Sequence, residues 1–167
     1  ISNLEISGIV ANGVGDADTY FGITISSPLT LTGDVTSSYT GVYAPDISIG
    51  GDIILGADVI FTNVDFQSRP GEAANDAINL NGHKMTLKTD ALYSSGVIGV
   101  AQMIIGTGTF DIDVRDSVTV FLAQQPYVPG GNTYSGTTNL LSGGTATSGG
   151  NTNTMFGSSA INVSPTA

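Results

Sequence analysis

The residues best placed to do chemistry form a run of acids in the second half of the chain. Asp111 and Asp113 are two positions apart, and Asp116 follows with Arg115 beside it. On a β-strand, residues two apart project from the same face, so the first two carboxylates would point in one direction. Paired carboxylates are the catalytic groups of glycoside hydrolases, and carboxylates also bind Ca²⁺. The pattern favours a third interpretation, a solvated outer face opposite the apolar residues of the same segment.

Two other polar groups are weaker candidates. Asp16 and Asp18, in the segment GVGDADTY, resemble part of a calcium loop but lack the further ligands and the closing Glu. His83 is the single histidine, and the chain has no Gly-x-Ser-x-Gly elbow to present a nucleophile to it. We therefore expect a plain turn at Asp16 and an exposed turn residue at His83. The sequence predicts no catalytic residue, no metal site and no cofactor.

Aromatic side chains offer a further way to bind, because they stack on sugar rings. Tyr127 lies between two prolines, and we expect it to be exposed. The remaining aromatic candidates are expected to pack in the core or at its edges, and they are Tyr20, Phe21, Tyr39, Tyr43, Tyr93 and Tyr134.

Composition excludes several classes of protein. The formal net charge is −10 and only four residues are Lys or Arg, so the basic surface that binds nucleic acid is missing. The absence of Cys excludes disulfides and thiolate metal sites. With 40% hydrophobic residues the chain has enough apolar side chains for a core, and its 23 glycines indicate many turns. These features are typical of an all-β protein.

A short sequence pattern, which we call the phrase, recurs four times. It consists of two apolar residues separated by one residue, and an Asp five or six positions after the first of them. The copies are Leu29–Asp34, Ile53–Asp58, Met85–Asp90 and Phe110–Asp116, and the steps between their first residues are 24, 32 and 25. A period of this size with strand-like content predicts a β-solenoid, in which each coil packs on its neighbours. The recurrent Asp would then cap a turn at one equivalent position in each coil.

Strand-like patterns cover much of the chain, and no 10–15-residue helical pattern separates them as βαβ crossovers would require. The segments are 1–10, 21–31, 45–64, 77–92, 97–105, 109–121 and, more weakly, 134–141.

The 32-residue step suggests an insertion of about eight residues, which we place in residues 65–76 (DFQSRPGEAAND). Insertions in a repeat form loops on one face, often the face that binds. The alternative is an elaboration without function. If the loop binds, its candidate residues are Asp65, Gln67, Arg69, Glu72 and Asp76.

Residues 131–138 read GNTYSGTT and resemble the signature of the autotransporter-associated β-strand repeat, which occurs in passenger domains of bacterial autotransporters. Residues 156–163 (FGSSAINV) are similar to the end of that repeat, so the resemblance covers 131–167. The chain departs from the family pattern at 139–141 and in the Gly-rich run 142–150, which interrupt the usual alternation.

The resemblance implies a right-handed parallel β-helix exported by type V secretion to the surface of a Gram-negative cell. It implies a non-catalytic stalk or adhesin in attachment or cell aggregation, whose parent protein is anchored by an outer-membrane barrel outside this chain. Its partner would be a host or bacterial surface glycan or protein, or another copy. We therefore expect residues 1–167 to form one β-helix segment of a longer passenger. The alternative is a carbohydrate-active β-helix enzyme, a polysaccharide hydrolase or lyase, that uses Asp111, Asp113 or Asp116.

Overall fold

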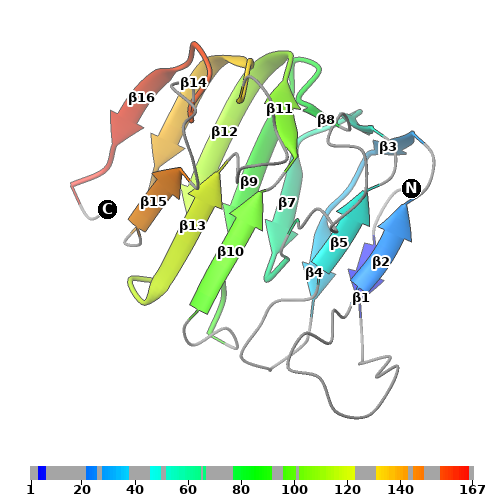
Figure 1. The fold of residues 1–167 in the computed structure, drawn as a ribbon, viewed down its shortest axis with the longest axis horizontal. Coiled ribbons are helices and arrows are strands. Elements are labelled where there is room, and N and C mark those ends of the chain that lie inside the picture. Colours follow the sequence, from blue (N-terminus) through cyan, green and yellow to red (C-terminus); the bar gives the residue numbers. More distant parts are fainter. Residues whose placement is uncertain are drawn as a thin grey trace.

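The structure of the chain, a computed structural model, is built from β-strands (Figure 1). It describes residues 4–6, 22–25, 28–37, 46–49, 52–64, 66, 77–91, 96–100, 102–122, 131–142, 145–148 and 155–165. These residues form strands and turns, and none of them is helical. The all-β prediction is therefore confirmed.

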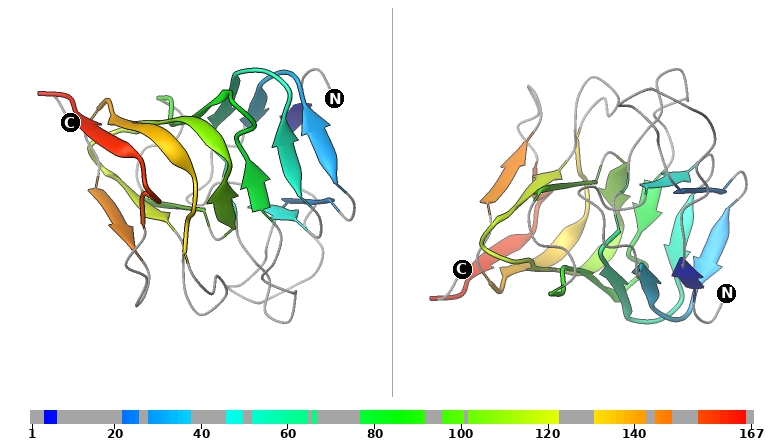
Figure 2. Two further views of the ribbon diagram at one scale, coloured as in Figure 1. Left: turned by 90° about the horizontal axis from the view of Figure 1, so that it is seen from above. Right: turned by 90° about the horizontal axis from the view of Figure 1, so that it is seen from below.

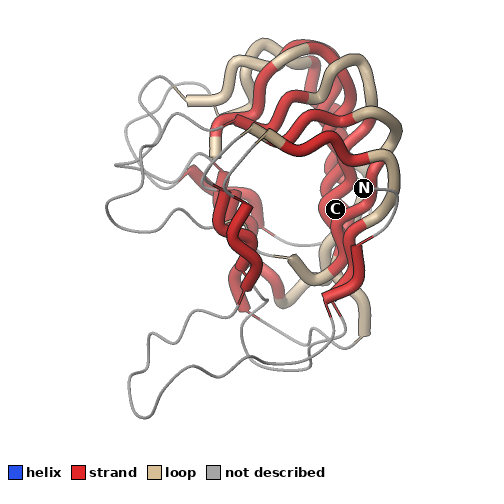
Figure 3. The backbone as a smooth tube through the Cα atoms, turned by 90° about the vertical axis from the view of Figure 1, so that its right-hand side faces the viewer, coloured by secondary structure: helices blue, strands red, loops and turns tan. Residues whose placement is uncertain are grey.

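The strands stack in parallel into a β-solenoid, and Figure 3, which looks along the stack, shows them arranged around a common interior. The largest sheet, which we call the first sheet, has the order β1-β4-β7-β9-β12-β14-β16. Its strands are β1 (Leu4–Ile6), β4 (Val35–Ser37), β7 (Val59–Thr62), β9 (Lys84–Lys88), β12 (Thr107–Asp113), β14 (Ser135–Leu140) and β16 (Ala160–Val163).

Two further sides complete each coil. The second sheet contains β3 (Leu29–Leu31), β6 (Ile53–Leu55), β8 (Ala77–Asn79) and β11 (Met103–Ile105). The remaining strands are β2 (Gly22–Ile25) paired with β5 (Asp46–Ile49), and β10 (Gly96–Val100), β13 (Val118–Leu122) and β15 (Thr145–Ser148) in another sheet. Every strand pair is parallel, so the prediction of a parallel β-helix is confirmed.

The register corrects the interpretation of the recurring phrase as one equivalent position. Leu29 pairs with Ile53 in the second sheet, whereas Met85 pairs with Val59 and Phe110 in the first sheet. The first two copies of the phrase therefore begin in the second sheet, and the last two begin in the first sheet. Spacing alone did not separate them because any strand that faces the interior alternates apolar and polar residues.

The same register removes the argument for an insertion at residues 65–76. The Asp52 carboxylate accepts a hydrogen bond from the backbone N–H of Ala77, 25 residues further on, across this segment. In the next coil of the same sheet, Ala77 pairs with Met103, 26 residues further on. The coil that contains 65–76 is therefore no longer than its neighbour. The 32-residue step is long because its first residue, Ile53, lies in the second sheet, whereas its last residue, Met85, lies in the first sheet.

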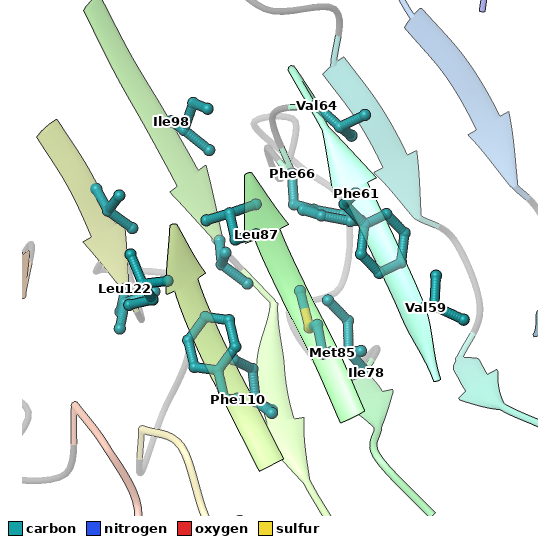
Figure 4. Close-up of a cluster of buried hydrophobic side chains, with 14 of the residues drawn as sticks. Val59, Phe61, Val64, Phe66, Ile78, Met85, Leu87, Ile98, Phe110 and Leu122 are labelled. Carbon is teal, nitrogen blue, oxygen red and sulfur yellow. The ribbon is translucent and has the colours of Figure 1, made fainter. Parts of the chain in front are cut away.

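Inward-facing side chains form continuous columns from coil to coil. In the first sheet, Phe61 stands in register with Leu87, and Met85 with Phe110, and all four side chains are fully buried. Figure 4 shows this cluster together with Phe66, whose ring meets the Phe61 ring edge-on at a centroid distance of 4.9 Å. Burying each such side chain stabilises the fold by about 1.5–3 kcal/mol, so the core rather than the turns holds the coils together.

Asn132, in the segment that resembles the autotransporter repeat, connects three successive coils. Its side chain is fully buried. Its Oδ1 accepts a hydrogen bond from the backbone N–H of Ile104 at 2.8 Å, and its Nδ2 donates to the carbonyl of Met155 at 2.7 Å. Both amide functions therefore satisfy a buried backbone group, one in the preceding coil and one in the following coil.

Gly136, in the same segment, marks a close approach of two backbones. Its φ is +127°, and a Cβ added there would lie 2.0 Å from the carbonyl oxygen of Gly108, its neighbour in β12. Only glycine fits this position without displacing backbone.

The Gly-rich tail does not interrupt the solenoid. Strand β14 continues through Leu140, and β15 (Thr145–Ser148) lies within the run that the sequence pattern left unassigned. Met155 and Phe156 are partly buried against the core, whereas Leu141 is exposed. Residues 160–163, in the segment that is similar to the end of the repeat, form β16.

Tyr134 heads a buried chain of hydroxyl groups that runs through Thr138 and Ser159. The Tyr134 hydroxyl contacts Thr138 Oγ1 at 2.5 Å, Thr138 Oγ1 contacts Ser159 Oγ at 2.6 Å, and Ser159 Oγ donates to the carbonyl of Phe156. Burial raises the pKa of Tyr134 above its ordinary value of 10.0, and the hydrogen bonds from Thr138 and Ser159 oppose that shift.

This shift predicts a loss of stability in alkali. Because the pKa of Tyr134 is higher in the folded chain, the unfolded chain releases this proton first as the pH rises past about 10. The stabilisation is therefore complete below pH 10 and falls above it. We expect Tyr134→Phe to have a shallower alkaline decline in the free energy of unfolding than the unmodified chain, measured by denaturant unfolding between about pH 8 and pH 11. Parallel declines in the two proteins would contradict this.

Candidate functional site

Asp111 and Asp113 lie on β12 in the first sheet, and their side chains face outward, as the alternation predicts. Asp111 is 7% exposed. Its Oδ1 accepts a hydrogen bond from Asn139 Nδ2 at 2.6 Å, and its Oδ2 lies 3.8 Å from Lys84 Nζ. The expectation of a solvated carboxylate is therefore wrong for Asp111, because the residues on the two adjacent strands cover it.

Asp113 is held by the same two neighbouring coils. Its Oδ1 accepts a hydrogen bond from Ser142 Oγ at 2.8 Å, and its Oδ2 lies 3.7 Å from Lys88 Nζ. All four oxygens of Asp111 and Asp113 thus have a partner on an adjacent coil. A general acid or a nucleophile has to reach a substrate atom directly, and this arrangement instead joins β9, β12 and β14 across their outer face.

The third acid of the cluster lies apart from this pair. Asp116 is exposed in the turn between β12 and β13, where Arg115, Asp116 and Ser117 line a surface cavity of about 290 Å³. Hydrogen bonds hold this turn: the Arg115 N–H donates to Thr89 Oγ1, and the Val118 N–H donates to the Arg115 carbonyl. No group of three His, Cys, Asp or Glu residues that could hold a metal occurs within the residues that the structure describes.

His83 lies in the turn that the sequence predicts for it. Its backbone N–H donates to the Leu80 carbonyl, and its side chain is 36% exposed. Nδ1 is 3.8 Å from Asp58 Oδ1, a carboxylate that also accepts the Lys84 N–H at 2.9 Å. The printed partners of His83 in the described part of the chain are thus Leu80 and Asp58, and no hydrogen bond joins it to a serine there.

Three of the four recurrent acids, Asp34, Asp58 and Asp90, connect successive coils. Asp34 and Asp58 accept the backbone N–H of Ile60 and Lys84, each 26 residues further on. Asp90 forms a reciprocal pair with Asn63: Asn63 Nδ2 donates to Asp90 Oδ1 at 2.9 Å, and the Asp90 N–H donates to Asn63 Oδ1 at 3.1 Å. The expected single Asp position in each coil is thus wrong, because register places these acids in different columns.

The five candidate binding residues Asp65, Gln67, Arg69, Glu72 and Asp76 lie outside the described residues. So do Asp16, Asp18, Tyr20, Phe21, Tyr39, Tyr43, Tyr93 and Tyr127. Of the segment 65–76 the structure describes Phe66, which is fully buried and donates its N–H to the Gly99 carbonyl at 2.8 Å. The segment is therefore anchored to the core next to its first candidate residue.

A row of polar side chains along the outer face of the first sheet escaped the sequence analysis. Asn162 Nδ2 donates to Asn139 Oδ1 at 3.0 Å, and Asn139 in turn donates to Asp111, which Lys84 approaches from the other side. These residues are more than 20 positions apart, so only a known coil register would have brought them together.

Comparisons with known proteins assign no relative. No protein-family model, no curated protein and no solved structure matches the chain. Within the described residues, the structure has no helix of the length and apolar character needed to cross a membrane.

Proposed function

We propose that this chain is a non-catalytic segment of a bacterial autotransporter passenger, exposed at the cell surface as part of a stalk or adhesin. The observation that carries the proposal is the resemblance of residues 131–138 to the autotransporter-associated repeat. The parallel β-helix supports it, because that resemblance implies this fold. Such a solenoid buries its core only between coils and leaves long lateral faces for contact with partners.

The engagement of the two central carboxylates supports the absence of catalysis. Asp111 and Asp113 direct all four oxygens at side chains of neighbouring coils. The alternative function, cleavage of a polysaccharide, would require one of these oxygens to face a sugar instead, or would have to use the exposed Asp116. A partner on a surface glycan or protein, or self-association, needs no such oxygen.

Localisation of the native protein in its source cell tests the proposal. We expect a species larger than 16.9 kDa that fractionates with the outer membrane or is shed from it, and that added protease removes from intact cells. A soluble species of about 16.9 kDa inside the cell would overturn the proposal.

Binding and cleavage are then measured on the same purified chain with a panel of surface glycans and acidic polysaccharides. We expect the double variant Arg69→Ala, Glu72→Ala to bind about tenfold more weakly, as for residues that contribute more than 1 kcal/mol to an interface. The matched control is Arg115→Ala, Asp116→Ala, which likewise removes one cation and one acid and keeps the net charge at −10. Equal loss in both would contradict a role for the 65–76 segment.

Cleavage is followed with Asp111→Asn as the test variant. We expect no turnover in either protein. Turnover by the unmodified chain that Asp111→Asn abolishes would replace the proposed role with that of a glycan-cleaving enzyme.

A further inference from the structure

The turn between β8 and β9 contains a dipeptide that is chemically labile. The Leu80 carbonyl accepts a hydrogen bond from the His83 N–H at 2.8 Å. The two residues between them have positive φ, +51° at Asn81 and +85° at Gly82. These are the features of a type I′ turn, for which Asn-Gly is a preferred pair. The flanking strands β8 and β9 lie in the middle of the stack, with coils on both sides of them (Figures 1 and 2).

An Asn that precedes Gly can lose its side-chain amide without an enzyme, because Gly has no Cβ to hinder the attack of its backbone nitrogen. That nitrogen attacks Cγ of the Asn, so a bond between the nitrogen and Cγ forms and the bond between Cγ and Nδ2 breaks. The amide nitrogen leaves as ammonia with the proton that the Gly nitrogen gives up, and a succinimide ring remains. Water then opens the ring at Cγ or at the backbone carbonyl carbon, which gives Asp or isoaspartate with no change of oxidation state.

Neighbouring coils hold both of the reacting nitrogens. The Gly82 N–H donates to the Thr107 carbonyl of the following coil at 2.7 Å. Asn81 Nδ2 donates to the Leu55 carbonyl of the preceding coil at 3.0 Å, and the Asn81 N–H donates to Asn79 Oδ1 at 3.0 Å. The attack requires the Gly82 nitrogen to give up its proton and the Asn81 side chain to turn Cγ toward that nitrogen. Each of these changes breaks a bond to an adjacent coil.

Burial does not protect the dipeptide. Asn81 and Gly82 are both exposed, so the water that opens the ring has access to them. The bonds to Leu55 and Thr107 are therefore the feature that separates the folded from the unfolded chain at this turn. They form only when the coils on both sides are stacked.

We propose that Asn81 is a site of spontaneous deamidation that the stacking of the coils suppresses, so that the modification accumulates in chains that remain unfolded. The product then opposes stacking. An Asp carboxylate at this position has no hydrogen to donate to the Leu55 carbonyl, and it places a negative charge beside that oxygen. Isoaspartate adds a methylene to the backbone of a turn whose flanking strands are fixed in register. The turn thus acts as a chemical record of the time that a chain has spent unfolded.

The first measurement follows deamidation of the purified 167-residue chain in one mildly alkaline buffer, with and without denaturant, by peptide mass spectrometry. We expect Asn81 to react at least about tenfold more slowly in the folded chain, because the rate follows the fraction of molecules in which the turn is open. Asn12-Gly13, the other Asn-Gly pair of the sequence, is the internal reference in denaturant, where the two sites should react at similar rates.

The second measurement tests the effect of the product on stacking. Asn81→Asp carries the carboxylate that deamidation creates, and we expect it to lower the denaturant concentration at the midpoint of unfolding. Thr36→Asp is the matched control, because it adds the same charge at an exposed residue of β4 in the first sheet. We expect the control to shift the midpoint less, since it removes no bond between Asn81 and Leu55.

Equal rates of deamidation at Asn81 in the folded and the denatured chain would overturn the proposal. An unreactive Asn81 in denaturant, where Asn12 reacts, would overturn it as well. Equal shifts of the midpoint in Asn81→Asp and Thr36→Asp would show that the product does not oppose stacking, and the inferred record would be wrong. The proposal does not depend on the role at the cell surface, and deamidation and localisation are measured separately, so either proposal can fail alone.

Discussion

Gly136→Ala is expected to lower the free energy of unfolding by about 3–5 kcal/mol, measured by equilibrium denaturation followed by circular dichroism. Two costs combine at this position. The φ of +127° is unfavourable for a residue with a Cβ, and the added atom would lie 2.0 Å from the Gly108 carbonyl oxygen. That oxygen belongs to the backbone of the adjacent strand, so relief requires β12 and β14 to separate.

Gly82→Ala is the control that separates these two costs. Gly82 also has a positive φ, +85°, but a Cβ there would have no atom within 4 Å. We expect this substitution to cost about 1 kcal/mol, the conformational part alone. Similar losses at Gly82 and Gly136 would show that the close approach of the two strands contributes little to stability.

The fold was predictable because a solenoid repeats its pattern. Alternating apolar residues, a period near 25 and scarce helix formers are all visible in the sequence, and they predict stacked parallel strands. β12 illustrates this, since Phe110 and Ile112 are buried while the Asp111 side chain between them faces outward. The alternation of apolar and polar residues is a local property of the sequence, so it can be recognised without knowing which strands lie side by side.

The contacts between coils were not predictable in the same way. Whether Asp111 faces solvent depends on Lys84 and Asn139, which lie on the strands to either side. An error in register changes every such partner, and the recurring phrase gave a wrong register because it combined strands of two sheets. Strand β15 was missed because its sequence, Thr145–Ser148, has little apolar content and lies in a Gly-rich run.

The GNTYSGTT segment owes its specificity to the geometry of the coils. Asn132 joins the coils on either side, Tyr134 fills the core and Gly136 permits contact with β12. These roles are structural, so the segment argues for a stacked β-helix directly and for a cell-surface role only through the resemblance. For this reason the proposed function rests on localisation and binding, whereas the role of the segment can be tested by stability.

Asn132→Ala is expected to lower the free energy of unfolding by about 2–4 kcal/mol, because it removes the partners of two backbone groups in a buried site. The N–H of Ile104 and the carbonyl of Met155 lose bonds of 2.8 and 2.7 Å. Thr133→Ala is the matched control: this neighbour is exposed, and its own N–H, which bonds to the Ile104 carbonyl, is kept. We expect the control to change stability by less than about 0.5 kcal/mol.

Hydrogen exchange distinguishes a lost bond from a cavity at the same site. If Asn132 satisfies the Ile104 N–H, that amide should exchange faster in Asn132→Ala by more than the global loss of stability explains. Amides of β7, three strands from β14 in the first sheet, should change only with the global stability, because each coil of a solenoid contacts only its neighbours. Equal acceleration of exchange at the Ile104 amide and at the amides of β7 would mean that Asn132 acts through packing alone. The coil-joining role inferred for it would then be wrong.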